Sequence, residues 1–248
     1  MALRSSNPAI SVIRNQAGAF NFGGEEAGAT ISGTTTKSIL LVALTMLVGL
    51  ASMNYTLQSI MYGNGVSNLL CYGSLIGAVV VAFITIFKPK ASPITAPLYA
   101  VLEGCALGSL SAVYEIKFPG ITTTAVLSTF VVVLSMLFLW KYKIIVPTQK
   151  FKAIITGAIT GIFVLYIINM IVSLFGGHFL PSSGPVSIII SLVVCTVAAF
   201  SLILDFDNIQ QGVEAGLPKE FEYYNAFSLL VTICWLYIEI LKLLSKRE

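Results

Sequence analysis

Long apolar runs separated by short polar breaks make up the chain from about residue 38 to its end. Each run has about 20 residues, the length that an α-helix needs to cross a hydrocarbon layer about 30 Å thick. The breaks contain turn residues, such as Pro119-Gly120 and Gly216 with Pro218. The pattern therefore predicts seven transmembrane helices, over residues 38–57, 68–87, 96–114, 122–140, 152–174, 186–205 and 223–244.

The first part of the chain has a different composition, rich in Ser, Asn, Gly, Thr and Ala. No continuous apolar segment follows the first basic residue, Arg4, so this part does not have the pattern of a cleaved signal peptide. We expect a mobile polar N-terminal tail over residues 1–36 and a seven-helix transmembrane domain over residues 37–248.

Composition supports an all-α, polytopic membrane bundle. Of the 248 residues, 56% are hydrophobic and 10% are charged, whereas soluble domains carry about 25% charged residues. The lipid bilayer is therefore the expected partner, and a secreted disulfide scaffold or a disordered chain is excluded. A net charge of +3 is too small and too scattered for a nucleic-acid binder.

Basic residues in the short loops predict the orientation, because they concentrate on the cytoplasmic side. Eight lie on the side of the N-terminus and four on the other: Lys37, Lys88, Lys90, Lys141, Lys143, Lys150, Lys152 and Lys219 against Lys117, Lys242, Lys246 and Arg247. This places the N-terminus in the cytoplasm. Seven spans then put the C-terminus outside, where three of the four opposing basic residues lie, so the side of the C-terminus stays open.

Four acidic residues at membrane depth are the candidate functional groups. Glu103 lies in the third predicted span, Asp205 and Asp207 close the sixth, and Glu239 lies in the seventh. These spans contain no arginine, and the nearest lysine is Lys242. Because lipid strongly disfavours unpaired charge, such carboxyl groups either hold a proton or share a bound cation. Both cases describe a site that responds to pH and to cations.

Structural explanations for the same residues stay open. Lys242 follows Glu239 by three positions and could form a helical ion pair with it, and the two aspartates could mark the end of a helix at the water interface. Asp205 and Asp207 differ by about 200° around a helix, so at most one faces a given partner. A hairpin turning near Leu217 would place Asp205 and Glu239 at depths that differ by roughly 15 Å.

Other residue types give weaker signals. The four cysteines stand alone in apolar runs and are expected to be small buried groups, and His178 is a loop histidine without a visible catalytic partner. The sequence contains neither a Gly-x-Gly-Asp nor a Gly-x-Ser-x-Gly segment, so we expect no enzyme. Three glycine pairs have the spacing that lets helices approach closely in lipid: Gly73 and Gly77, Gly104 and Gly108, and Gly157 and Gly161.

Several segments resemble the bacterial branch of the Bax inhibitor-1 family. They are the opening residues 4–9, the third-span segment 97–103, and the C-terminal segments 204–209, 212–219 and 226–244. The resemblance implies a seven-helix bundle with the last helix surrounded by the others. It also implies a pH-sensitive calcium leak, governed by a carboxylate pair that joins the sixth and seventh helices.

By position in the motif, Asp205 matches the sixth-helix carboxylate of that pair and Glu239 the seventh-helix one. This makes them candidate calcium ligands. Better-studied members of the family carry aspartate at the position of Glu239, with fewer residues between the two acids, and an arginine within some bundles has no counterpart here. Asp207 is therefore a candidate to replace or augment Asp205.

The combined expectation is a calcium leak channel of the plasma (inner) membrane, gated by Glu103, Asp205, Asp207 and Glu239. No cofactor is expected apart from possible calcium, and protein partners are unknown. A proton-coupled carrier of small solutes or ions is one alternative, although no internal repeat is evident. A non-conducting regulatory membrane protein is another.

Overall fold

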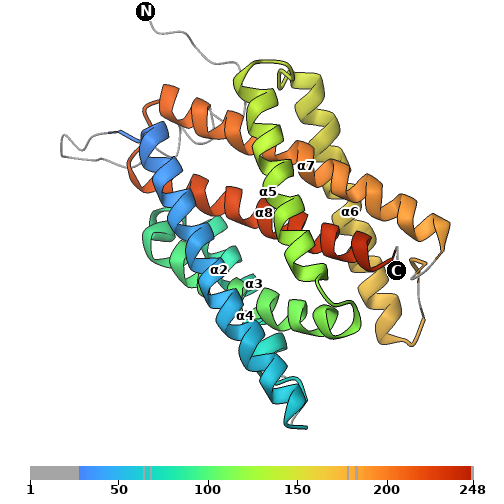
Figure 1. Cartoon of the computed structure of the whole chain (residues 1–248). Helices are drawn as coiled ribbons and strands as arrows, with labels where there is room; N and C mark the ends of the chain where they lie inside the picture. Colours follow the sequence, from blue (N-terminus) through green and yellow to red (C-terminus); the bar gives the residue numbers. More distant parts are fainter. Residues whose placement is uncertain (1–27, 64, 68, 178, 182–183, 247–248) are drawn as a thin grey trace, which may run out of the picture.

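The computed structural model describes residues 28–246 apart from 64, 68, 178 and 182–183. Within these residues it contains helices, turns and coil and no β-strand. Seven helical segments are long and apolar enough to cross a membrane, which confirms the predicted fold class (Figure 1). The α-helices are α2 (Ile31–Met61), α3 (Ser74–Phe87), α4 (Ser92–Lys117), α5 (Ile121–Lys141), α6 (Gln149–Leu174), α7 (Pro185–Glu214) and α8 (Glu220–Ser245). A π-helical turn (Leu69–Gly73) precedes α3 and extends the second span to Leu70–Phe87, and a short 3-10 turn (Pro89–Ala91) precedes α4.

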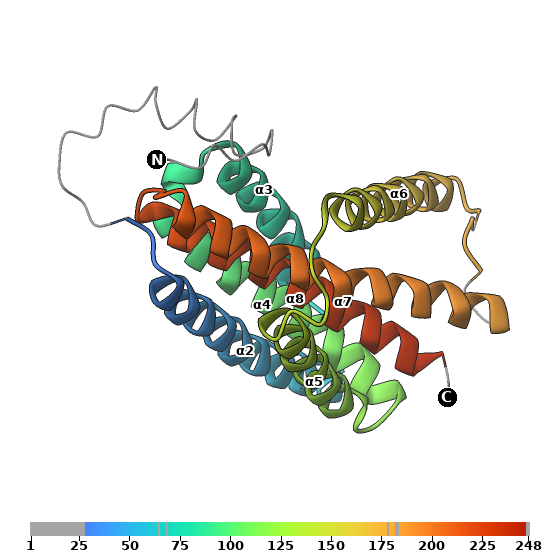
Figure 2. The same cartoon turned by 90° about the horizontal axis from the view of Figure 1, so that it is seen from above.

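Helix α8 runs through the middle of the bundle, as the resemblance implied. It packs against α2, α4, α5 and α7, which surround it in Figure 2. One buried apolar cluster joins α8 to α5 and α7, and a second joins it to α2, α3 and α4. Helix α6 lies at the periphery and packs mainly on α7, so most of its surface is open to the surrounding lipid.

Local polar contacts define where several helices begin. The Thr30 side chain accepts a hydrogen bond of 2.9 Å from the Gly33 N–H and caps α2. Before α5, Gly120 adopts a φ of 86°, a conformation that glycine tolerates best. The Glu115 carboxylate, at the end of α4, accepts from the N–H groups of Gly120 at 2.6 Å and Thr122 at 3.0 Å. This carboxylate therefore caps the next helix.

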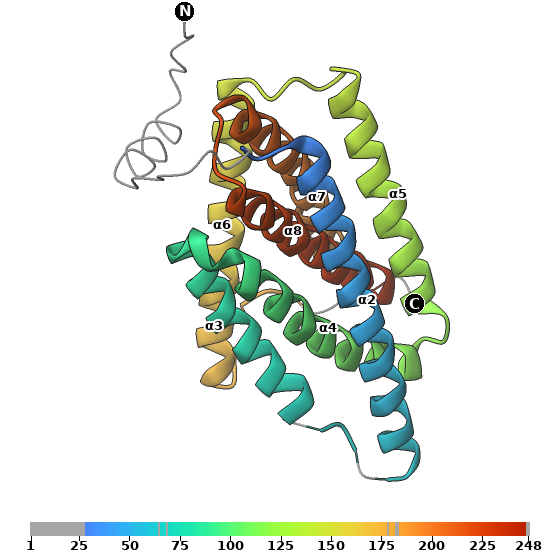
Figure 3. The same ribbon diagram turned by 90° about the vertical axis from the view of Figure 1, so that its left-hand side faces the viewer.

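The closest helix contact joins α2 and α4, which cross in Figure 3. A Cβ atom added at Gly104 would lie 2.7 Å from the Thr45 carbonyl oxygen, and one at Gly108 would overlap the Gly49 carbonyl oxygen. The pair Gly104 and Gly108 thus permits the close approach that its spacing predicted.

The prediction is wrong for the glycine pair on α6. A Cβ at Gly157 or Gly161 would meet nothing within 4 Å. Small residues permit close packing only when a neighbouring helix faces them, and α6 presents this pair to open space. The spacing alone could not tell these two cases apart.

Two boundaries also differ from the sequence prediction. Helix α7 continues from the predicted end at 205 to Glu214, so the aspartates do not mark its end. Helix α2 begins at Ile31, inside the segment assigned to the polar tail. Residues 1–27 of that tail, and His178, lie outside the described residues.

Candidate functional site

Helix α4 runs parallel to α8 with a register that three contacts define. The Ser92 hydroxyl donates to the Glu220 carbonyl at 2.9 Å. The rings of Tyr99 and Phe227 meet edge to face, with centroids 5.0 Å apart. Further along, the hydroxyls of Ser111 and Tyr237 lie 2.7 Å apart. This register places Glu103 level with α8 residues near 230.

Asp205 approaches α8 from α7. Its Oδ1 atom accepts a hydrogen bond of 2.8 Å from the Ser228 hydroxyl. Its Oδ2 atom is buried and accepts no hydrogen bond among the described residues, although the Thr232 hydroxyl of α8 lies near the carboxyl group. Because the side chain is only 8% exposed, an ionised Asp205 would hold a charge that lacks full compensation.

Glu103 approaches α8 from α4. It is 7% exposed and lies near the Tyr99 hydroxyl, on its own helix, and the Cys234 thiol of α8. No ion pair to Glu103 or to Asp205 occurs among the described residues. The structure therefore brings two buried carboxyl groups without a cation partner to the same level of the central helix.

Asp207 has a different environment from Asp205, although only one residue separates them. The Lys152 ammonium, from the first turn of α6, forms an ion pair with Asp207, and the Gln211 amide also donates to it. The rotation of about 200° between the two positions explains this difference. Asp205 faces α8, whereas Asp207 faces α6.

The charge of Glu239, like that of Asp207, is compensated by a lysine. It is 1% exposed, and its Oε1 atom accepts from the Tyr166 hydroxyl of α6 at 2.9 Å and from the Lys242 ammonium at 3.1 Å. The Lys242 ammonium also lies 5.2 Å from the centroid of the Tyr166 ring. The ion pair considered from the sequence is therefore present, and α6 adds a donor to it.

The structure does not bring Asp205 and Glu239 together. Asp205 accepts its hydrogen bond from Ser228 of α8. Glu239 lies 11 residues after Ser228, which is about 16 Å along the helix at 1.5 Å per residue. The described residues contain no group of three or more His, Cys, Asp or Glu side chains that could hold a metal ion. Joint calcium ligation by Asp205 and Glu239 would need a rearranged bundle, and it stays a prediction.

Sequence reasoning missed the donors Ser228, Tyr166 and Lys152. Ser228 and Tyr166 are polar side chains inside apolar spans, which is the signal that could have marked them. Lys152 was read as a loop lysine for orientation, whereas it belongs to α6. Which acid each donor reaches depends on helix rotation and register, and these are set by packing.

A further buried acid, Glu222, was also missed. Its carboxylate forms an ion pair with Lys37 and accepts from the Thr30 N–H at 2.8 Å and from the Thr30 hydroxyl at 2.9 Å. A Cβ added at Gly33 would overlap this carboxylate. Glu222 thereby joins the start of α8 to the start of α2.

The C-terminal basic residues are engaged with the bundle. Lys242 pairs with Glu239, and the Lys246 ammonium donates to the Ser191 hydroxyl at 2.7 Å and to the Ser187 carbonyl at 3.3 Å. Burial lowers the pKa of Lys246. Two of the three C-terminal basic residues that opposed the predicted orientation thus make structural contacts.

Comparison with known proteins assigns the family. A search of curated proteins and a search of solved structures give no match. A family model described as "Bax inhibitor 1 like" matches residues 7–248, nearly the whole chain. The structure agrees with this match, since the last helix lies at the centre of the bundle with the acids beside it. The chain belongs to the Bax inhibitor 1-like family of membrane proteins.

Proposed function

We propose that the protein is a pH-sensitive cation leak channel, with calcium as its principal cation, gated by carboxyl groups inside the bundle. One observation carries the proposal: Glu103 and Asp205 are buried at the same level on two sides of α8, and neither has a cation partner among the described residues. Asp207 and Glu239 are each paired with a lysine and serve to hold α6.

The protonation state of the uncompensated pair would set the conformation. A neutral carboxyl group is far less costly to bury than a charged one. The packed arrangement, with one oxygen of Asp205 left without a partner, therefore suits the protonated form. Ionisation would favour a more hydrated bundle in which water or a cation reaches Glu103 and Asp205. Flux should then rise with pH.

Calcium fits the chemistry of these groups. It prefers several oxygen ligands, including carboxylates, hydroxyls and carbonyls. Asp205 and Glu103 would supply carboxylate oxygens, and Ser228 lies beside the first of them. Glu239 could join them only after the bundle rearranges. Calcium is here the transported ion and not a resident cofactor, and we propose no catalytic role for the acids.

Calcium flux into liposomes that hold the purified protein tests the proposal. Flux is compared at pH 6 and pH 8 for the unmodified protein and for the double variant Glu103→Gln, Asp205→Asn. We expect flux to be larger at pH 8 and to lose this pH dependence in the double variant. The matched control is Asp207→Asn, which removes a carboxylate that already has a lysine partner. If the double variant keeps the flux and its pH dependence, the proposed gate is wrong.

The same measurement separates the alternatives. A proton-coupled carrier would show flux that saturates with substrate or runs against its gradient. A non-conducting regulatory protein would show no flux at either pH. Neither alternative accounts for two unpaired carboxyl groups at one level as directly as a pH-dependent leak does.

We also propose a plasma (inner) membrane location with the N-terminus in the cytoplasm, on the basis of the basic residues in the loops. Single cysteines test the orientation, since a membrane-impermeant thiol reagent reaches only one side of intact cells. A cysteine at Lys143 should be protected, and one at Lys117 should react. The reverse pattern would contradict this orientation.

A further inference from the structure

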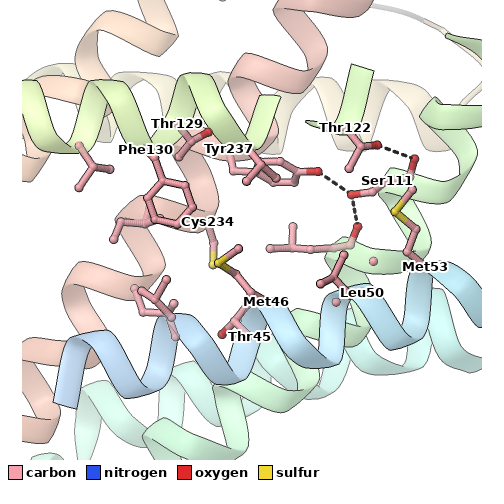
Figure 4. Close-up of a pocket in the computed structure, with 18 residues that line it drawn as sticks. Thr45, Met46, Leu50, Met53, Ser111, Thr122, Thr129, Phe130, Cys234 and Tyr237 are labelled. Carbon is pink, nitrogen blue, oxygen red and sulfur yellow. Dashed lines mark hydrogen bonds between the residues drawn. The ribbon is translucent and has the colours of Figure 1, made fainter. Parts of the chain in front are cut away.

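A pocket that none of the acids lines lies between α2, α4, α5 and α8. Its volume is about 140 Å³, and residues from the middle of the membrane helices line it. Figure 4 shows Met46, Leu50 and Met53 of α2 on one side and Thr129 and Phe130 of α5 on the other. The side chains of Cys234 and Tyr237, from α8, lie between them.

The pocket wall has no charged group, and its hydroxyl groups form hydrogen bonds within the protein, so it does not favour water or a charged ligand. None of the lining residues is charged. The Thr45 hydroxyl donates to the Leu41 carbonyl at 3.0 Å, and the Thr129 hydroxyl donates to the Ala125 carbonyl at 2.7 Å. Ser111 and Tyr237 bond to each other, as Figure 4 shows. A cavity of this kind stays dry and accepts an apolar guest.

The mouth of the pocket opens toward the hydrocarbon of the bilayer. Leu50 on α2 is 56% exposed and Phe130 on α5 is 40% exposed, and both belong to membrane-spanning helices. The inner wall, by contrast, is closed: Leu230 is 1% exposed and Cys234 is 4% exposed. The lining is therefore continuous with the lipid-facing surface at its mouth and ends at the central helix.

We propose that this pocket binds the terminal segment of a lipid acyl chain from the surrounding bilayer. An engineered cavity of about 150 Å³ in another protein holds benzene, so the space here suits about six carbon atoms. That is the end of a chain and not a whole lipid. The thioethers of Met46 and Met53 are flexible apolar groups that adapt to such an occupant. A bound acyl chain would contact α8 between the levels of Ser228 and Glu239.

Photo-crosslinking in proteoliposomes tests this site. The probe is a phosphatidylcholine with a diazirine near the end of one acyl chain, and peptide mass spectrometry locates the adducts. Because Cys234 and Tyr237 are buried, adducts on them require entry into the pocket, whereas adducts on Leu47 or Val131 need only contact with bulk lipid. We expect adducts on both sets of residues in the unmodified protein.

Filling the pocket supplies the decisive comparison. Val126 lines the pocket and Val131 faces lipid on the same helix, so Val126→Trp and Val131→Trp form a matched pair. We expect Val126→Trp to reduce adducts on Cys234 and Tyr237 at least tenfold and Val131→Trp to leave them unchanged. If Val126→Trp is not monodisperse on size exclusion, Leu50→Trp fills the mouth from α2 instead. Absence of adducts on the α8 wall, or adducts that persist in the filled variant, would overturn the proposal, whatever the calcium flux shows.

Discussion

The Ser228 hydroxyl donates a hydrogen bond of 2.8 Å to Asp205 Oδ1, so the carboxylate of the sixth membrane helix is joined to the last helix more than two turns away from Glu239. This contact matches a simple α7–α8 hairpin that turns near Leu217. It replaces the direct pairing of Asp205 with Glu239 that the family resemblance implied.

A double-mutant cycle should detect this pairing. We expect Asp205→Asn and Ser228→Ala to be coupled by about 0.5–3 kcal/mol in the free energy of unfolding, as contacting residues are. Asp205→Asn and Glu239→Gln should be additive to within about 0.5 kcal/mol. Unfolding in mixed detergent micelles supplies the measurement. Strong coupling in the second cycle would show that the two acids do touch.

Lys37→Met should strongly destabilise the protein. It removes the cation from Glu222, which is 2% exposed and keeps the two donors of Thr30, and losing a hydrogen bond to a charged group costs about 1.5–3 kcal/mol. The matched control is Lys219→Met, at an exposed lysine next to the start of α8, which should change stability by about 0.5 kcal/mol or less. Equal effects of the two variants on the unfolding free energy would contradict the assigned role of Glu222.

Alanine at Gly108 and at Gly157 should have different consequences. At Gly108 the new Cβ would overlap the Gly49 carbonyl oxygen, and such overpacking costs about 1–3 kcal/mol. At Gly157 the Cβ meets open space, and alanine is the better helix former, so stability should stay equal or increase. Thermal unfolding of both variants in one detergent tests the comparison. Similar losses would mean that α6 is packed against something at Gly157.

Tyr166→Phe should loosen α6. The change removes one donor from the charged Glu239 carboxylate, a loss of about 1.5–3 kcal/mol, and it leaves Lys242 as the other partner. Because α6 otherwise packs mainly on α7, hydrogen exchange should accelerate in α6 and remain unchanged in α4. The control is Tyr142→Phe, at a side chain that is 62% exposed. Exchange that accelerates evenly across the bundle would argue against a specific contact.

The sequence predicted the seven helices correctly, since length and apolar composition decide whether a segment spans a membrane. It misjudged the end of α7 because Asp205 and Asp207 look like the start of a polar loop. In the fold these side chains find partners on α8, on α6 and on α7 itself, so the helix continues to Glu214.

The sequence marked four acids at membrane depth and missed Glu222, and it did not show that the four are of two kinds. Lys152 and Lys242 compensate Asp207 and Glu239, whereas Glu103 and Asp205 have no ion pair among the described residues. Lys242 is close in sequence to its partner and was foreseen. Lys152 comes from another helix, and only the packed orientation of α6 brings it to Asp207.

The contact between Thr30 and Glu222 also bears on how the protein is made. The two residues are separated by 192 positions, so the residue that caps the first described membrane helix is itself held by a carboxylate of the last described one. During synthesis α2 leaves the ribosome long before α8, and its first turn lacks this acceptor until Glu222 has emerged. The start of α2 therefore reaches its described environment only once α8 is in place, and a chain truncated before α8 lacks the carboxylate that Thr30 and Lys37 contact.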